Sequence, residues 1–363
     1  MKKNKNYVDL KDQPVPEGQH LLEVDDLKMY FHTEDGVVRA VDGVSYTLDR
    51  GETLGVVGES GSGKSVTAMT IMGLISMPPG KIEGGDVRYR GRSILEMTEE
   101  EMQHIRGNDI AMIFQDPMTS LNPVYKIGKQ VGEGLRLHRG YSKQEALKRA
   151  TELLDLVGIP EPEKRVNEYP HQFSGGMRQR VMIAMALACD PDILIADEPT
   201  TALDVTIQAQ IIELMQEMQE KNGNAIIMIT HDLGVVADMA DKIMVMYAGR
   251  PVEFGTAEEI FYESCHPYTW GLIRSIPEQA IDEKKPLTPI HGNPPSLMNL
   301  PEGCVFSPRC PYATDKCRKQ RPERFVTESG HYSACHYAGD PEFLKNAPVT
   351  SRTRKDSKKG GEA

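Results

Sequence analysis

One stretch of the chain, Gly58-Glu59-Ser60-Gly61-Ser62-Gly63-Lys64-Ser65, constrains the fold more than any other. It has the pattern G-x-x-x-x-G-K-[ST], it follows the apolar residues 53–57, and a helix-compatible segment comes next. Glycines here let the backbone wrap a polyphosphate, so that N–H groups and a helix N-terminus point at the anion. A glycine-rich turn before a helix is the plainer alternative, but it leaves the Lys-Ser pair unexplained. We expect a nucleoside triphosphate, ATP, to be bound by Gly58, Ser60, Gly61, Ser62, Gly63, Lys64, Ser65 and Val66, with Lys64 at the β- and γ-phosphates and Ser65 on Mg²⁺.

A second apolar run, residues 193–196, ends in the two carboxylates Asp197 and Glu198. Its length and β-branched content favour a strand that is buried on both faces of a parallel sheet. The C-terminal edge of such a sheet is where α/β proteins bind their ligands. We therefore expect Asp197 to hold Mg²⁺ and Glu198 to polarise the attacking water as a general base. The alternative is an acidic pair that caps the next helix.

Between these motifs, Ser174-Gly175-Gly176 precedes a helix-like run over residues 181–189. A hydroxyl and two unobstructed backbone N–H groups at a helix N-terminus form a second anion site. One nucleotide does not need two triphosphate sites. The economical interpretation is that this segment binds the γ-phosphate of a nucleotide held by another subunit.

With this segment the chain resembles the ATP-binding-cassette ATPases, in which two cassettes sandwich two ATP molecules head to tail. Phe173 and Met177 replace the commoner Leu and Gln of the family's signature, and neither change touches Ser-Gly-Gly. The resemblance implies an α/β fold: a P-loop cassette with a parallel-sheet core, an antiparallel β region and a helical subdomain. It also implies ATP hydrolysis.

The resemblance assigns four further residues. Gln115, after the apolar residues 110–113, matches the Q-loop glutamine that contacts Mg²⁺ and the attacking water. His231 matches the switch histidine that contacts the γ-phosphate, and Asp204 lies in a segment like the D-loop at the dimer interface. Phe31 aligns with the aromatic residue that stacks on adenine. Taken singly, each would more often be an ordinary structural residue.

Composition bounds the location of the protein. No apolar run in the 363 residues approaches the roughly 18–20 residues that span a bilayer, and residues 1–7 lack the apolar core of a signal peptide. We therefore expect a peripheral protein on the cytoplasmic face of the cell membrane, attached through partners. The formal net charge of -11 disfavours nucleic acid as a partner.

The chain divides into segments along its length. Asp35-Gly36 predicts a hairpin turn between residues 27–31 and 37–41, and Thr98-Glu99-Glu100-Glu101 resembles a capped helix start. We expect an N-terminal tail (1–20), the nucleotide-binding domain (21–255, helical over about 98–190), a small loop-rich C-terminal domain (256–340) and a C-terminal tail (341–363).

The C-terminal segment indicates which group of cassette ATPases the chain resembles. Residues 265–269, 290–295 and especially 303–311 resemble the ATPases of oligopeptide and dipeptide importers, with nickel importers as close relatives; residues 198–210 look like the first of the two paralogous ATPases of those systems. This implies that the chain powers peptide uptake through two transmembrane permease subunits. Its other partners would be a paralogous second ATPase and an extracellular substrate-binding protein. A nickel or other small-solute importer is the alternative; a soluble cassette protein would normally carry two cassettes or a long coiled-coil insertion.

Four of the six cysteines, Cys304, Cys310, Cys317 and Cys335, lie close together in the sequence. A cytosolic enzyme rarely keeps structural disulfides, so a metal site is the natural interpretation. The absence of a C-x-x-C pair disfavours zinc, and single, widely spaced cysteines suit an iron–sulfur cluster. The resemblance also implies a [4Fe–4S] cluster here. Zinc and unligated thiols are the alternatives.

Overall fold

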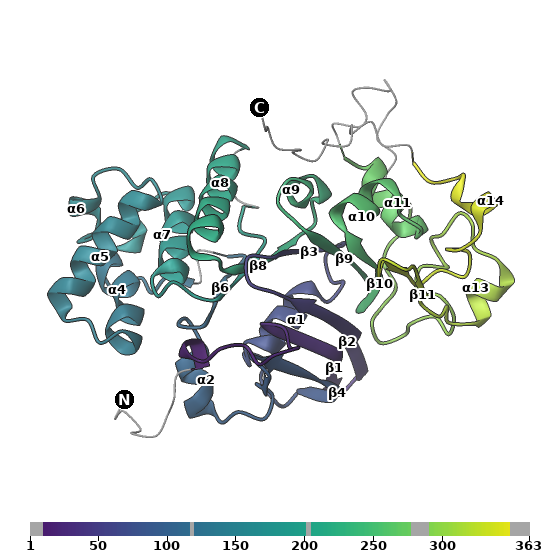
Figure 1. The fold of residues 1–363 in the computed structure, drawn as a ribbon, viewed down its shortest axis with the longest axis horizontal. Helices are drawn as coiled ribbons and strands as arrows, with labels where there is room; N and C mark the ends of the chain where they lie inside the picture. Colours follow the sequence, from purple (N-terminus) through teal and green to yellow (C-terminus); the bar gives the residue numbers. More distant parts are fainter. Residues whose placement is uncertain (1–9, 117–119, 201–204, 277–289, 349–363) are drawn as a thin grey trace.

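The computed structural model describes residues 10–116, 120–200, 205–276 and 290–348. An eight-stranded sheet runs through the middle of the molecule in the order β11-β12-β10-β9-β3-β8-β7-β6 (Figure 1). β6, β7, β8, β3 and β9 pair in parallel, whereas β10, β12 and β11 are antiparallel. The strands are β3 (Thr53–Val57), β6 (Ile110–Ile113), β7 (Ile193–Asp197), β8 (Ala225–Thr230), β9 (Lys242–Tyr247), β10 (Arg250–Thr256), β11 (Phe325–Val326) and β12 (Tyr332–Ser333).

The parallel strands form because their sequences are almost entirely apolar. Every residue of β3, β6, β7 and β8 is buried, as expected for strands that are covered on both faces. The predicted parallel core is confirmed.

A second, antiparallel sheet has the order β2-β1-β4-β5. Its strands are β1 (Leu22–Thr33), β2 (Gly36–Leu48), β4 (Gly80–Tyr89) and β5 (Arg92–Ser93). Thr33 pairs with Gly36, so β1 and β2 join through a two-residue loop, Glu34-Asp35. The predicted hairpin is confirmed. Its two-residue loop begins one position before the predicted Asp35-Gly36 turn, and its strands are longer than predicted.

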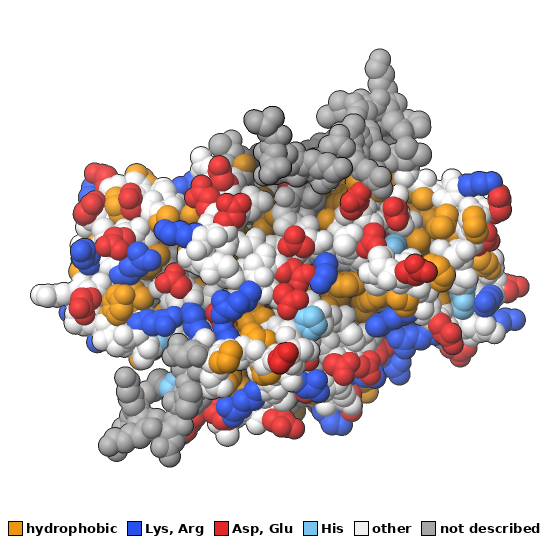
Figure 2. Space-filling view, in the orientation of Figure 1, with side chains coloured by type: hydrophobic (Ala, Val, Ile, Leu, Met, Phe, Trp, Pro, Cys, Tyr) orange, Lys and Arg blue, Asp and Glu red, His pale blue; other side chains and the backbone are white. Residues whose placement is uncertain are grey.

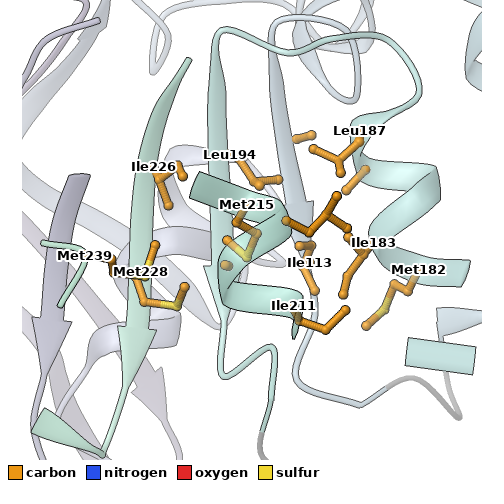
Figure 3. Packing of buried hydrophobic residues seen from close by; sticks show 14 of the residues in the cluster. Ile113, Met182, Ile183, Leu187, Leu194, Ile211, Met215, Ile226, Met228 and Met239 are labelled. Atoms are coloured by element: carbon orange, nitrogen blue, oxygen red, sulfur yellow. The ribbon is translucent and has the colours of Figure 1, made fainter. Parts of the chain in front are cut away.

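Helix α1 (Lys64–Ile71) connects the two sheets. Ala68 and Ile71 are buried in one hydrophobic cluster with residues of β1, β2, β3, β7 and β8. A larger cluster lies on the other face of the main sheet, where helix residues such as Ile183, Leu187 and Met215 pack against Leu194 and Ile226 (Figure 3). Packing on both faces fixes the carboxyl ends of the parallel strands.

The helices of the first two thirds of the chain gather mainly at one end of the molecule (Figure 1). Thr98 and Ser142 each form a capping box, so the predicted helix start at Thr98 is confirmed. The elements are η1 (Leu10–Asp12), α2 (Glu99–Ile105), α4 (Ile127–His138), α5 (Lys143–Leu156), α6 (Pro162–Arg165), η2 (Pro170–Gln172), α7 (Gly175–Leu187), α8 (Val205–Asn222) and α9 (Leu233–Ala237).

The C-terminal segment lies at the opposite end, with α10 (Ala257–Tyr262), α11 (Pro267–Arg274), α13 (Asp315–Lys319) and α14 (Pro341–Leu344) (Figure 1). It does not stand apart from the cassette, because β12 pairs with β10 and extends the main sheet.

No helix in the described part of the chain is long and apolar enough to cross a bilayer. Asp and Glu side chains stand among the Lys and Arg side chains on the face drawn in Figure 2.

Candidate functional site

The glycine-rich loop lies between β3 and α1, at the carboxyl end of the parallel strands. Gly58 and Gly63 have φ of 153° and 100°, in the region that favours glycine. A Cβ at Gly58 would lie 2.2 Å from the Met246 carbonyl oxygen, and one at Gly63 would lie 2.3 Å from that of Ala40. The close packing behind the loop therefore requires both glycines.

Two polar groups of the loop are placed where they could bind an anion. The Ser62 hydroxyl is buried and has no hydrogen-bond partner in the described part of the chain. Lys64 is 5% exposed, and its Nζ donates to the carbonyl oxygens of Gly58 at 2.7 Å and Glu59 at 3.0 Å. Burial lowers the pKa of Lys64, while the nearby carboxylates oppose that shift. A phosphate would supply the partner that Ser62 lacks and a stronger acceptor for Lys64.

Ser65 and Asp197 form an oxygen pair suited to Mg²⁺. Ser65 is in the first turn of α1, and Asp197 ends β7; the hydroxyl donates to Oδ1 of the carboxylate at 2.9 Å. Burial and the neighbouring Glu198 raise the pKa of Asp197, against the lowering effects of Ser65 and Lys64. A hydroxyl and a carboxylate are ligands that Mg²⁺ takes in nucleotide sites.

Glu198 brings two other predicted residues together. Its Oε2 accepts from Gln115 Nε2 at 3.0 Å, and its Oε1 lies 3.3 Å from Nδ1 of His231. The residue has φ of 47°, and its N–H donates to the Ile229 carbonyl at 2.9 Å, which ties the turn after β7 to β8. The carboxylate side chain is 12% exposed, whereas His231 is 57% exposed. The carboxylate is thus held at the sheet edge with its partners facing solvent.

The predicted second anion site is the N-terminus of α7. Ser174 is the exposed N-cap residue, and its Oγ accepts from the Met177 N–H at 3.3 Å. A Cβ on Gly175 would meet nothing within 4 Å. Phe173 is buried in the core, so its aromatic ring serves packing. The Ser-Gly-Gly segment is therefore accessible from outside the chain.

The remaining predicted residues lie as follows. Phe31 is half-buried in β1 and packs against the cluster around α1. Ser60 and Gly61 are exposed at the tip of the loop, and Val66 is half-buried in α1. Asp204 lies outside the described residues.

Two contacts at this site were not predicted. Gln179 of α7 donates to the Pro199 carbonyl oxygen at 2.6 Å, which links the signature helix to the turn that carries Glu198. Glu59 of the glycine-rich loop forms an ion pair with Arg309 of the C-terminal segment. Arg309 lies within residues 303–311, which the sequence singled out only as a family resemblance.

Cys304, Cys310, Cys317 and Cys335 line one small pocket in the C-terminal segment. Burial raises the pKa of Cys304, that of Cys310 to about 11 and that of Cys335 to about 12.

Comparisons with known proteins agree with this geometry. Residues 41–201 match the ABC transporter family model, and residues 252–317 match the model of the oligopeptide/dipeptide transporter C-terminal region. The oligopeptide transport ATP-binding protein OppD of Bacillus subtilis is 58% identical over 312 residues, which cover 86% of this chain and 87% of OppD. The dipeptide transport ATP-binding protein DppD of Escherichia coli K12 is 52% identical over 320 residues, 88% of this chain and 97% of DppD.

Among solved structures, the chain is similar to a dimeric, post-hydrolysis ATP-binding cassette bound to ADP and Pi. The TM-score is 0.60 at 29% identity, and the match covers 65% of this chain and 98% of that cassette.

The prediction of a [4Fe–4S] cluster needs correction. The names of these relatives mention no iron–sulfur centre. Within the described ranges, the potential metal-binding group whose ligand atoms all lie within 4.8 Å consists of Glu253, Cys265 and His331, and none of the four cysteines belongs to it. On these findings the prediction is wrong, and we assign no metal to the four cysteines.

Proposed function

Because this chain belongs to the ATP-binding-cassette ATPases of the oligopeptide and dipeptide transporter family, we propose that it hydrolyses ATP to drive peptide uptake through a membrane permease pair. One observation carries the proposal. Six predicted site residues from different strands or loops meet at one sheet edge: Lys64, Ser65, Asp197, Glu198, Gln115 and His231.

The same contacts support a role for each residue in nucleotide binding. Lys64 would move from the carbonyls of Gly58 and Glu59 to the β- and γ-phosphates, and the loop N–H groups with the Ser62 hydroxyl would hold the phosphate oxygens. Ser65 and Asp197 would hold Mg²⁺, which neutralises phosphate charge when bound. We propose that Phe31 stacks on adenine.

The contacts of Glu198 support a role as general base. A water between its carboxylate and the γ-phosphate would be oriented by Gln115 and His231, which already contact that carboxylate. The water oxygen attacks phosphorus, the bond to the β-phosphate oxygen breaks, and Glu198 accepts the proton.

The accessible N-terminus of α7 supports a dimer. We propose that Ser174, Gly175 and Gly176 bind the γ-phosphate on a paralogous second ATPase, with Asp204 at the interface. The dimeric cassette bound to ADP and Pi is a precedent for such pairing. The Gln179–Pro199 contact would transmit closure at the signature helix to the turn that carries Glu198.

A groove of about 830 Å³ between α4 and α5 supports a permease contact. Its apolar lining includes Val124, 71% exposed, and Tyr125, 44% exposed. Four cationic side chains also line it, those of Lys126, Lys129, Arg136 and Lys143. A loop with an apolar residue flanked by carboxylates would fit this groove, so we propose a cytoplasmic permease loop as its occupant.

We propose the division of the chain that the sequence predicts: an N-terminal tail (1–20), a nucleotide-binding domain (21–255), a C-terminal domain (256–340) and a C-terminal tail (341–363). We further propose that the protein sits peripherally on the cytoplasmic face of the membrane and serves a system with an extracellular peptide-binding protein. A nickel or small-solute importer would use the same ATPase chemistry, because the cargo is selected by other subunits.

Affinity purification of the tagged chain from solubilised membranes tests the proposal. We expect two multi-spanning membrane proteins and a second ATPase to co-purify, together with ATP hydrolysis. Lys129→Glu with Arg136→Glu, both on α4, should weaken permease recovery. Lys148→Glu, exposed on α5 but outside the groove, should not. Recovery of the ATPase without any membrane protein would contradict the proposal.

A further inference from the structure

A buried side chain of the C-terminal segment contacts the glycine-rich loop. The Arg309 side chain is 4% exposed, and its two terminal nitrogens donate to the two carboxylate oxygens of Glu59 at 2.6 and 3.0 Å. The two residues are 250 positions apart in the chain. Paired, nearly parallel hydrogen bonds of this kind fix geometry as well as charge.

The remaining N–H groups of the Arg309 guanidinium donate to other acceptors and fix its position. Nε donates to the His291 carbonyl at 2.9 Å, and the terminal nitrogens also reach the Ile290 carbonyl at 3.1 Å and the Tyr247 hydroxyl at 3.3 Å. Each of the five N–H groups of the guanidinium thus has an acceptor available. Arg309 is therefore a fixed support for Glu59.

A second contact holds the backbone of the same loop residue. The Glu59 N–H donates to the Tyr268 hydroxyl at 2.9 Å. The Tyr268 ring packs against Tyr247 and Phe306, with ring centroids 4.6 and 5.3 Å away. Phe306 also belongs to the C-terminal segment, so both supports of Glu59 come from outside the parallel core.

These supports become more important when a triphosphate binds. In the ligand-free loop, Lys64 also holds the carbonyl of Glu59. A polyphosphate that engages Lys64 would take that bond away, and Tyr268 and Arg309 would remain as the side chains that hold Glu59. Arg309 also neutralises a carboxylate that would otherwise stand beside a polyanion.

We infer that Arg309 is a positioning residue for nucleotide binding: through Glu59, the C-terminal segment sets the affinity of the glycine-rich loop for a nucleoside triphosphate. The inference rests on the proposed function, since it assumes that this loop binds ATP. It adds a role for the C-terminal segment inside the nucleotide site.

The test measures ATP affinity in the full-length chain by displacement of a fluorescent ATP analogue in the presence of Mg²⁺. Arg309→Gln should raise the Kd for ATP about tenfold, because it leaves the Glu59 carboxylate unpaired near the phosphates. Arg318→Gln is the matched control, since Arg318 lies in the same segment in an exposed pair with Asp315. It should leave the Kd unchanged.

The decisive variant is the double substitution Glu59→Gln with Arg309→Gln. It removes the unpaired charge, so we expect its Kd to return to within about threefold of the wild type. A purely structural role for Arg309 would lower the melting temperature without giving this rescue. If Arg309→Gln does not fold, Tyr268→Phe keeps the packed ring, removes the acceptor of the Glu59 N–H, and should also weaken ATP.

The outcomes separate the two claims. A wild-type chain that does not bind ATP would overturn the proposed function. A wild-type chain that binds ATP, with folded Arg309→Gln or Tyr268→Phe variants of equal affinity, would overturn the inference alone. Weakened binding in Arg309→Gln that the double substitution does not restore would also overturn it.

Discussion

At the scale of single residues, the site contains side chains that destabilise the ligand-free protein and that a bound ligand would stabilise. Asp197 is 2% exposed, and its carboxylate has a raised pKa because burial disfavours the charge. The Ser62 hydroxyl is buried without a partner among the described residues. Such groups cost stability until a ligand compensates them.

Asp197→Asn should therefore stabilise the ligand-free protein and inactivate it. A carboxyl group whose folded pKa is raised destabilises the fold above that pKa, and the penalty disappears as the pH falls through it. Asn carries no charge and can still accept from Ser65, so we expect the melting temperature at pH 7 to rise by about 1–3 °C. Mg²⁺-dependent hydrolysis should be lost. Asp315→Asn, at an exposed aspartate, should change neither quantity; a lower melting temperature for Asp197→Asn would contradict this account.

Glu198→Gln should keep ATP affinity and lower hydrolysis by about 10²–10⁴-fold, because an amide preserves the shape but cannot accept a proton. Phosphate release is measured with the permease present, and a closed, nucleotide-bound dimer should accumulate. The exposed Glu220→Gln is the control. Near-wild-type turnover in Glu198→Gln would remove Glu198 from the role of base.

Much of the residue-level site could be predicted because its signals are local. The glycine-rich loop and the pair Asp197-Glu198 are contiguous motifs whose chemistry follows from a few neighbouring residues. The ion pair between Glu59 and Arg309 had no such signal, because it depends on how residues 250 positions apart pack. The four cysteines show the opposite error, since their spacing and the family resemblance suggested an iron–sulfur cluster that the comparisons and the metal-binding groups of the described residues do not support.

At the scale of secondary-structure elements, helix α7 is the component with two roles. Its N-terminus is exposed at Ser174, while its body is buried and Gln179 contacts the turn after β7. The sequence predicted the helix from its N-cap and apolar content. The Gln179 contact could not be predicted, because it depends on the angle at which α7 crosses the sheet.

Ser174→Arg should block hydrolysis by the assembled transporter without weakening ATP binding to the isolated chain. The substitution also removes an N-cap, which costs about 1 kcal/mol. Ser142→Arg is the matched control, because Ser142 caps α5 in the same way and lies outside the signature. ATP titration of the monomer and phosphate release by the complex are compared for both. A large loss of ATP binding by the Ser174→Arg monomer would instead place the signature in its own pocket.

At the scale of the whole molecule, one buried carboxylate joins the two sheets. Asp192, just before β7, accepts from Arg90 at 2.5 Å, from the Tyr89 hydroxyl at 2.6 Å and from Arg50 at 2.8 Å. Tyr89 ends β4 of the antiparallel sheet. The side chains of Asp192 and Arg90 are 4% and 3% exposed, so this ion pair is shielded from solvent.

Asp192→Ala should lower the free energy of unfolding by about 3–5 kcal/mol, because it leaves the buried guanidinium of Arg90 unpaired. Chemical denaturation followed by circular dichroism measures the change. Asp315→Ala breaks only an exposed pair with Arg318 and should cost less than about 1 kcal/mol. Equal midpoints for the two variants would show that Asp192 does not tie the sheets together.

The pairing of β12 with β10 has a consequence for the solubility of the cassette. The outer edge of β10 would otherwise present open backbone groups, the kind of edge that recruits foreign strands and leads to aggregation. Glu253 and Phe254 instead face Ser333 and Tyr332, and the Ala334 N–H donates to the Val252 carbonyl. A replacement of the C-terminal segment would therefore leave this edge open unless the new segment supplied a strand of matching register. The C-terminal segment thus also shields the cassette of this chain from edge-to-edge association.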